Sequence, residues 1–351
     1  MTSIRALGFA AIFATAMATA AHAGGYQFSP IVVPPPVGDL VYDPPYPDNA
    51  QALSINDNGQ VLVSALNVSG ADAPGDNVDF NDVYNIHTHV FTPLPDVPGA
   101  VAHSTLANGI NDSGQIVGQY DPGVTTTPDG ASSAFSYSGG VYTTINPFND
   151  SDNNIFALAI SNNGLITGAD DNIDSMGNAL SSQGFVGSGS LYTSFQFGSV
   201  PGTFTVGRGV NDSGTVAGQY GLPSGDSGAF LYAGGVFTPI NIPGAVYIEV
   251  GQMNDAGVLV GQVFFDGGAV EDGFIDDNGV ITLLNFPGSP YTFIEGINNQ
   301  GDIVGTYSVS ADVQGAFLAV PAPEPATWAL MLVGLGLVGV GTRRRRAAAL
   351  A

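Results

Sequence analysis

Residues 110–120 read Ile-Asn-Asp-Ser-Gly-Gln-Ile-Val-Gly-Gln-Tyr, and residues 210–220 repeat the pattern as Val-Asn-Asp-Ser-Gly-Thr-Val-Ala-Gly-Gln-Tyr. Asn and Asp side chains bond to nearby backbone groups, and glycine readily takes positive φ. Such a turn, followed by alternating apolar residues, predicts a β-hairpin closed by a glycine bulge. The later glycine, Gly118 in the first example, lies inside the second strand, where it predicts a bulge or a close approach of neighbouring backbone.

The motif occurs six times, and its copies start at the apolar residues Ile55, Ile110, Ile160, Val210, Met253 and Ile297. Successive copies therefore lie 55, 50, 50, 43 and 44 residues apart. Each period also holds an aromatic β-like run, such as residues 134–137, and a run after a glycine turn, such as residues 141–145. The segment that enters the turn supplies a fourth strand. Four short strands per period are typical of a propeller blade.

The two ends of the repeat region fit together. The last aromatic run, residues 315–320, has no outer partner after it, whereas residues 24–31 match residues 234–240 of an outer run in type. We therefore predict that the segment around residues 26–31 pairs with residues 315–320. This pairing would close an all-β, six-bladed propeller of four-stranded blades over residues 24–320 and leave no open sheet edge.

Charge is distributed very unevenly along the chain. There are 30 acidic and 6 basic residues, and five of the six arginines are Arg5, Arg343, Arg344, Arg345 and Arg346. Since Glu324 is the single acid outside residues 24–323, that stretch holds 29 acids and Arg208, a formal charge of −28. So negative a surface repels phosphate backbones and anionic lipids, which argues against nucleic-acid binding. The chain has no cysteine, so the fold rests on its core without disulfides.

The first 23 residues have the outline of a secretory signal peptide. Arg5 precedes an apolar run over residues 6–21, and Ala21-His22-Ala23 forms a small-x-small cleavage site before Gly24. We expect an N-terminal signal helix that signal peptidase removes during export. A retained N-terminal anchor is the alternative, although the run is short and weakly apolar for one.

Residues 321–351 form a second targeting segment. The order is Pro323-Glu324-Pro325, an apolar stretch over residues 326–341 that predicts a hydrophobic helix, and then Arg343 to Arg346. The arginines would hold that end on the cytoplasmic side. This order resembles the PEP-CTERM sorting signal of Gram-negative bacteria that make extracellular polysaccharide. The resemblance implies transient inner-membrane anchoring, processing by an exosortase, and release to the cell surface or beyond. A simple tail anchor is the alternative.

The repeats resemble the extracellular HAF family, which is named for a His-Ala-Phe strand start. Ala-Phe is kept at Ala134-Phe135, Ala229-Phe230 and Ala316-Phe317, but Ser or Gly stands where the histidine would be. This resemblance implies an extracellular location and a fold, and carries no activity.

Residues that break the repeat are better site candidates than those that keep it. The turn acids Asp57, Asp112, Asp212 and Asp255 recur with the turn, and Asn162 and Asn299 replace the acid in two copies, so we interpret them as structural. The position two before each leading apolar residue varies instead: Leu53, Asn108, Leu158, Arg208, Gly251 and Glu295. We predict that these residues line a central channel. Arg208 would then contact an anion or glycan, or else balance surrounding carboxylates.

Acid-rich loops are candidates for calcium sites. Three such loops could hold calcium or could be solvated: one with Asp72, Asp76, Asp79 and Asp82, a second with Asp150 and Asp152, and a third with Asp170, Asp171 and Asp174. His87 and His89 share a strand face, but two histidines are weak evidence for zinc or copper.

No nucleophile motif, phosphate loop or catalytic cluster stands out. We therefore expect a non-enzymatic surface or matrix propeller whose partners are exopolysaccharide or surface proteins. The alternative is a secreted glycan hydrolase or lyase, with its site at the channel mouth and a calcium ion as its cofactor.

Overall fold

The computed structural model describes residues 25–33, 50–66, 79–102, 104–123, 132–148, 154–173, 179–265, 271–310 and 313–322. The predicted signal peptide with Ala21, Ala23 and Gly24, and the sorting residues from Pro323 to Arg346, lie outside these ranges. The two predicted terminal helices are therefore not described. Within the described ranges, no helix is long and apolar enough to span a membrane.

The described strands form antiparallel units of four strands, which we name by their first strand. Single parallel pairs, Ser182 with Phe204 and Glu271 with Tyr291, join four of these units two by two into eight-stranded sheets. The β2 unit has β2 (Ala50–Ile55), β3 (Gln60–Leu66), β4 (Asp79–Asn85) and β5 (Val90–Pro93). The β6 unit has β6 (Leu106–Ile110), β7 (Ile116–Tyr120), β8 (Ser133–Ser138) and β9 (Val141–Ile145). The β10 unit has β10 (Asn154–Ile160), β11 (Ile166–Ile173), β12 (Ala179–Ser188) and β13 (Leu191–Phe195).

The second half of the chain continues in the same way. The β14 unit has β14 (Phe204–Val210), β15 (Val216–Gly221), β16 (Ser227–Ala233) and β17 (Val236–Ile240). The β18 unit has β18 (Ala245–Met253), β19 (Leu259–Phe265), β20 (Glu271–Asp277) and β21 (Val280–Leu283). The β22 unit has β22 (Tyr291–Ile297), β23 (Ile303–Ser310), β24 (Val313–Pro321) and, as its fourth strand, β1 (Tyr26–Ile31).

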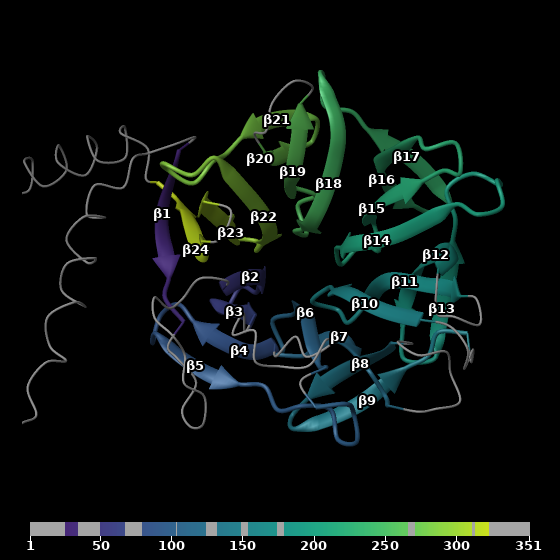
Figure 1. Cartoon of the computed structure of the whole chain (residues 1–351), viewed down its shortest axis with the longest axis horizontal. Helices are drawn as coiled ribbons and strands as arrows, with labels where there is room; N and C mark the ends of the chain where they lie inside the picture. Colours follow the sequence, from purple (N-terminus) through teal and green to yellow (C-terminus); the bar gives the residue numbers. More distant parts are fainter. Residues whose placement is uncertain are drawn as a thin grey trace, which may run out of the picture.

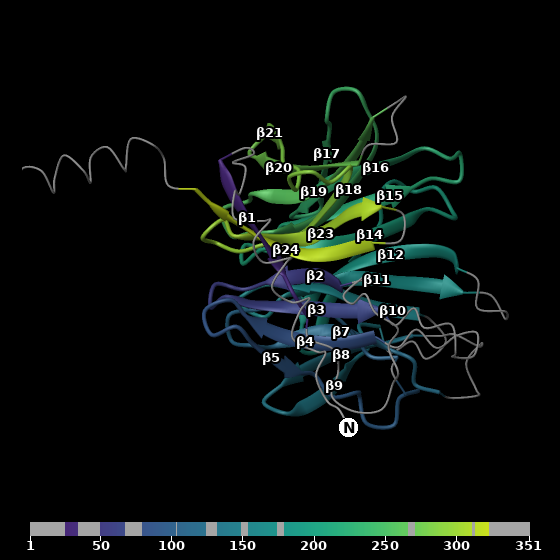
Figure 2. The same ribbon diagram turned by 60° about the vertical axis from the view of Figure 1, so that its left-hand side comes forward.

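The units stand side by side around a common centre, toward which the first strand of each unit points (Figure 1). Turning the molecule shows β1 lying alongside β24, so that the two ends of the strand region meet (Figure 2). Their register runs antiparallel from Tyr26 opposite Pro321 to Ile31 opposite Ala316. The predicted pairing of these segments is thus present, and the chain has an all-β, propeller-like fold.

A bulge interrupts the first strand of each unit. In β6, Ala107 pairs with Gly118 and Gly109 pairs with the next residue of β7, so Asn108 has no partner and forms the bulge. A Cβ atom on Gly118 would lie 1.9 Å from the Leu106 carbonyl oxygen, so only glycine fits. Gly168, Gly218, Gly261 and Gly305 meet the same close backbone oxygen in their own units. The strand glycines were predicted to mark either a bulge or a close approach of neighbouring backbone. Both are present, because the bulge in the first strand brings its backbone close to the glycine.

The core repeats with the units. Directly opposite the strand glycines lie five fully buried phenylalanines of the third strands: Phe135, Phe185, Phe230, Phe274 and Phe317. In four of these units, those with Gly118, Gly168, Gly218 and Gly261, the ring lies against the space that the glycine leaves open. The β2 unit departs from this rule, since Val63 faces Asp82 there.

Candidate functional site at the centre of the ring

The Asn-Asp turns fold as their composition predicts. In the first copy, the Gly59 N–H donates to the Asn56 carbonyl at 3.1 Å, and the Asn56 N–H donates to the Gln60 carbonyl at 3.0 Å. Gly59 has a φ of 69°, and the glycines at the same place in the other copies are also positive. Asn56 Oδ1 caps the loop by accepting from the Gln60 N–H at 2.9 Å. The turn is therefore fixed by local chemistry.

The turn tips are also bonded to one another around the centre. The Asp57 N–H donates to Asp112 Oδ1 at 2.7 Å, and the Asn299 N–H donates to Asp57 Oδ1 at 2.7 Å. Comparable bonds run from Asp112 to Asn162, Asn163 to Asp212, Asp212 to Asp255 and Asp255 to Asn299. This turn ring links every unit to the next. The interpretation of the turn acids as structural agrees with these contacts.

The two asparagines of the turn ring offset the repulsion between its carboxylates. Asn299 Nδ2 donates to Asp57 Oδ2 at 3.0 Å and to Asp255 Oδ2 at 2.8 Å. Asn162 Nδ2 lies 3.4 Å from Asp255 Oδ2. Burial raises the pKa of Asp112; the hydrogen bond from the Asp57 backbone lowers it, and the charges of Asp57 and Asp255 raise it further. Another carboxylate here would therefore be costly.

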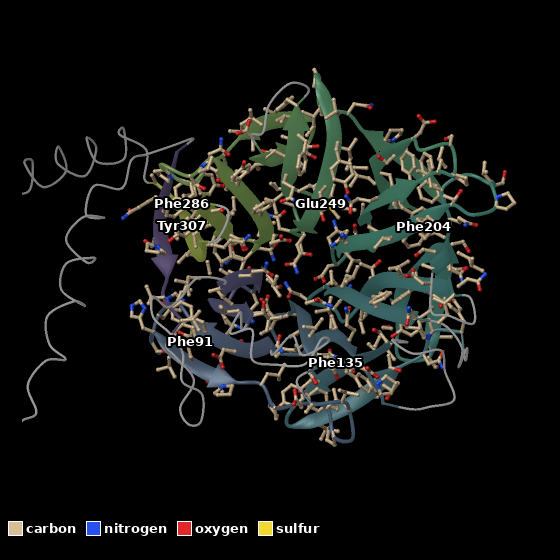
Figure 3. The ribbon with its side chains drawn as sticks, in the orientation of Figure 1. Phe91, Phe135, Phe204, Glu249, Phe286 and Tyr307 are labelled. Atoms are coloured by element: carbon tan, nitrogen blue, oxygen red, sulfur yellow. The ribbon has the colours of Figure 1, made fainter. Side chains whose placement is uncertain are left out.

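The six varying positions come together in space. Leu53, Asn108, Leu158, Arg208, Gly251 and Glu295 line a single cavity of about 90 Å³, together with Val250 and Gln252. We call this cavity the Arg208 chamber. Its lining residues stand at the bulges of the six first strands. Figure 3 labels Glu249, which lies on one of these strands, β18.

Gln252 crosses the centre of the ring. Its Oε1 accepts from Ser54 Oγ at 3.0 Å, and its Nε2 donates to the Asn108 carbonyl at 3.3 Å. It lines both the Arg208 chamber and a second cavity of about 40 Å³ among the turns. The corresponding residues of the other copies are small: Ser54, Gly109, Ala159, Gly209 and Gly296. Gln252 therefore separates the chamber from the turn ring.

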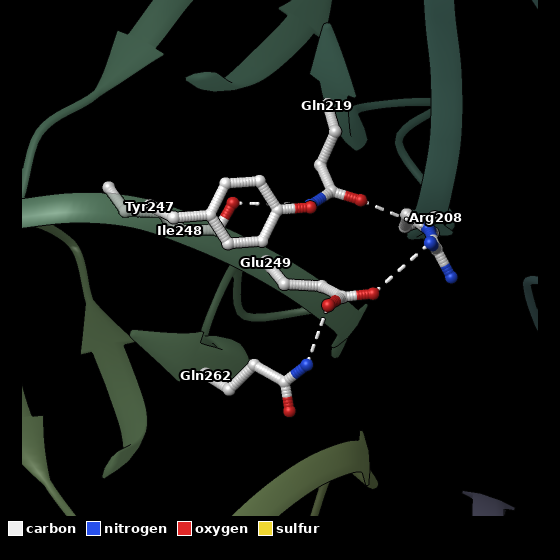
Figure 4. A network of polar contacts seen from close by, with 6 residues as sticks. All are labelled: Arg208, Gln219, Tyr247, Ile248, Glu249 and Gln262. Atoms are coloured by element: carbon white, nitrogen blue, oxygen red, sulfur yellow. Dashed lines mark hydrogen bonds and ion pairs between the residues drawn. The ribbon is translucent and has the colours of Figure 1, made fainter. Parts of the chain in front are cut away.

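Arg208 is held by two neighbours (Figure 4). Its Nη2 lies 3.2 Å from Glu249 Oε1, and its Nε donates to Gln219 Oε1 at 3.1 Å. Gln262 Nε2 donates to Glu249 Oε2 at 2.6 Å. Arg208 does balance a carboxylate, as one interpretation of the sequence held. These contacts use two of its five N–H groups, so donors remain for the other interpretation as well.

Glu295 faces Arg208 and Glu249 from the neighbouring β22 strand. Burial raises the pKa of Glu295 to about 7, while Arg208 lowers it and Glu249 raises it. No described residue is a hydrogen-bond partner of this half-buried carboxyl. Asn108, the third predicted polar residue, donates to Gln119 Oε1 at 3.2 Å and to the Ala157 carbonyl at 3.0 Å.

The predicted calcium ligands are only partly described. Asp72, Asp76, Asp150, Asp152 and Asp174 lie outside the described ranges, and of Asp79 only the backbone is described. Asp82 takes the place that phenylalanine fills in other units, and burial raises its pKa. Asp170 is 2% exposed and accepts from Gln183 Nε2 at 2.9 Å; burial raises the pKa of Asp171.

No group of three or more His, Cys, Asp or Glu among the described residues is arranged to hold a metal ion. The prediction that His87 and His89 share a strand face is wrong, because both lie in the turn between β4 and β5, where His89 Nδ1 lies 2.7 Å from Tyr84 Oη. Calcium binding by the loops that are not described stays a prediction.

Several residues around the chamber were missed in the sequence: Gln219, Tyr247, Glu249, Gln252 and Gln262. The signal that could have revealed Gln252 is its size at a position where every other copy has Ser, Gly or Ala. Glu249 likewise stands where the other copies have Gln51, Leu106, Phe156, Val206 and Phe293.

Comparison with known protein families gives a match at the C-terminal end of the chain. Residues 321–346 match the model of the PEP-CTERM protein-sorting motif. The chain carries a PEP-CTERM sorting motif. This motif implies exosortase processing of an exported protein that is sorted to the cell surface. It begins at Pro321, the last residue of β24. The likeness of the repeats to the HAF family stays a prediction.

Solved structures with distant similarity are propeller proteins and enzymes. The β-propeller domain of the Trilobed protease from Pyrococcus furiosus is 12% identical, with a TM-score of 0.43 over 78% of this chain and 94% of that one. A lectin from Aleuria aurantia, in complex with Fucalpha1-6GlcNAc, is 15% identical with a TM-score of 0.43 over 81% and 98%. A sialidase from Trypanosoma rangeli is 9% identical with a TM-score of 0.48, and 55% of its chain is covered. The search of curated proteins gave no match.

Proposed function

We propose that this PEP-CTERM protein is a non-enzymatic, six-bladed propeller that binds or organises exopolysaccharide at the cell surface or in the extracellular matrix. Residues 1–23 are its signal peptide, residues 24–320 its propeller and residues 321–351 its sorting tail. Exosortase and signal peptidase are its processing partners.

One observation carries this proposal. The sorting motif begins at Pro321, where β24 ends, and β24 is the strand that pairs with β1. Cleavage within the tail would therefore release the sheet that joins the two ends without removing a strand. Six turn copies and the four-stranded pairing of the described strands support the count of six blades.

The size of the Arg208 chamber supports a binding role over a catalytic one. Its volume of about 90 Å³ is well below the roughly 150 Å³ of a protein cavity that encloses a benzene ring. Glycosidases place two carboxyl groups on either side of a scissile bond, with the sugar between them. A sugar ring does not fit inside this chamber.

A secreted glycan hydrolase or lyase is the second candidate, and one observation favours it. Glu249 is paired with Arg208, whereas burial raises the pKa of Glu295 to about 7, and contrasting environments of two carboxyl groups are common where one acts as an acid.

The test compares the wild-type chain with a variant in which Pro323, Glu324 and Pro325 are all alanine. We expect the wild type in the medium and on the cell surface, and the variant in the inner-membrane fraction. The exported wild type is then mixed with exopolysaccharide from the producing cells. Retention of the protein without release of reducing ends or unsaturated sugars supports the proposal. Sugar release would establish the second candidate, and neither retention nor release would refute both.

A further inference from the structure

The charged residues that break the repeat, together with Gln252, gather on one side of the ring, while the polar Asn108 lies on the other side in β6. Arg208, Glu249, Gln252 and Glu295 come from the consecutive first strands β14, β18 and β22. On the other side, Leu53 and Leu158 fill equivalent positions with apolar side chains. The fold therefore does not require charged groups at this level, and their concentration calls for a separate explanation.

The Arg208 chamber is closed at one end and has an aromatic ring nearby. Gln252 closes it on the side of the turn ring, as its bonds to Ser54 and Asn108 show. Tyr247 and Glu249 are two residues apart on the regular part of β18, so they share one face of the sheet. Tyr247 therefore lies on the same face of β18 as the Glu249 carboxylate that contacts Arg208 of the chamber.

Tyr247 is both fixed and accessible. Its ring packs edge-on against Phe264, with centroids 5.4 Å apart and planes at 68°, and its Oη lies 3.4 Å from Gln219 Nε2. The residue is nonetheless 41% exposed. Figure 4 shows the ring beside Gln219, which also contacts Arg208. A fixed, exposed aromatic face next to polar side chains can stack against the apolar face of a sugar.

The polar groups of the site match hydroxyl groups in number and kind. Arg208 has three N–H groups beyond those that contact Glu249 and Gln219. Glu295, which lines the chamber, has no hydrogen-bond donor among the described residues. A hydroxyl both donates and accepts, so a group of hydroxyls serves both sides of this network.

The charge of the protein and the size of the chamber restrict the class of ligand further. The formal charge of −28 over residues 24–323 disfavours an anionic polymer. Since the chamber is smaller than the roughly 150 Å³ cavity that encloses a benzene ring, it admits the hydroxyl-bearing edge of one residue and leaves the sugar ring outside. We propose that the Arg208 chamber and Tyr247 together bind the end of a neutral glycan chain, with the sugar on Tyr247 and its hydroxyls between Arg208 and Glu295. This inference rests on the proposed association with exopolysaccharide.

The test measures binding of the exported protein to an array of neutral and hexuronate oligosaccharides. The best neutral ligand is then titrated by calorimetry against three variants. Tyr247→Ala removes the stacking face, and Arg208→Lys keeps the charge but loses the planar donor fork. Leu191→Ala is the control, because Leu191 is 82% exposed on the distant outer strand β13. We expect at least about ten-fold weaker binding for the first two variants and no change for the control, in proteins with unchanged circular dichroism.

Each other outcome has a distinct meaning. Equal affinity of all variants refutes this site but leaves glycan binding intact. Binding of hexuronates alone refutes the neutral ligand class. Retention on exopolysaccharide without binding to any array sugar refutes end recognition, whereas loss of retention as well refutes the proposed function itself.

Discussion

Glu295→Gln should stabilise the protein, and the gain should depend on pH. The pKa of Glu295 rises from its ordinary value of 4.5 to about 7 because folding buries the carboxyl beside Glu249. A raised pKa means that the folded state holds the proton more tightly than the unfolded state. The free energy of unfolding is therefore highest below pH 4.5 and falls as the pH rises to about 7.

The magnitude follows from the shift. A displacement of about 2.5 pKa units corresponds to about 3 kcal/mol at about 1.4 kcal/mol per unit, and access of solvent to the half-buried carboxyl makes this an upper bound. Arg208 and Glu249 are the charged groups that act on Glu295. The other residues that line the Arg208 chamber are uncharged. The glutamine variant should hence match the wild type near pH 4 and exceed it by up to about 3 kcal/mol near pH 8.

The assay is urea unfolding followed by circular dichroism at several pH values between 4 and 8.5. Glu249→Gln is the matched control, since the same chemical change there removes the ion pair of Arg208. That control should gain less at high pH than Glu295→Gln, because loss of the ion pair with Arg208 offsets the relief of Glu295 from the Glu249 charge. A gain for Glu295→Gln that is the same at every pH, or a loss near pH 8, would show that the carboxyl is not buried as described.

Three other substitutions test separate parts of the fold. Gly118→Ala should lower the free energy of unfolding by more than about 3 kcal/mol, because its Cβ would lie 1.9 Å from the Leu106 carbonyl oxygen. The control Gly221→Ala, whose Cβ would have nothing within 4 Å, should change stability little. Equal effects of the two variants in urea unfolding would contradict the bulge. Asn299→Asp should destabilise the protein by about 1–2 kcal/mol at neutral pH and less in acid, since it places a third carboxylate next to Asp57 and Asp255. If the difference in melting temperature between variant and wild type did not depend on pH, the turn ring would be contradicted. Gln252→Gly should cost about 1 kcal/mol through loss of the bonds to Ser54 and Asn108, and an unchanged unfolding curve would mean that Gln252 does not bridge the ring.

Features that repeat could be predicted from the sequence. The turn at Asn56 to Gly59 is set by side chains within five residues, and six copies show which positions are constant. The pairing of β1 with β24 could be predicted because residues 24–31 match an outer run that the last period lacks. The varying positions were predicted to share a lining for the same reason, and the structure places them around one chamber.

Contacts between different copies could not be predicted in this way. Gln252 bonds to Ser54, 198 residues away, and Arg208 pairs with Glu249, 41 residues away. Such partners depend on how neighbouring units pack, which no local pattern encodes. The different core of the β2 unit could not be predicted either, because there Val63 and Asp82 replace the glycine and phenylalanine of the other units. Asp82 suggested a metal ligand in the sequence, and the structure places it, half-buried, at the register position of those phenylalanines.

A cysteine cross-link tests the closure of the ring most directly, because the chain has no cysteine of its own. Gln27 and Val320 lie opposite each other on β1 and β24, so a Gln27→Cys, Val320→Cys variant should form an intramolecular disulfide on oxidation. The control pairs Gln27→Cys with Thr238→Cys on the outer strand β17 of another unit. A closed ring predicts a monomeric cross-link in the first variant and none in the control. Failure of the first pair to cross-link within one chain would contradict the closed propeller.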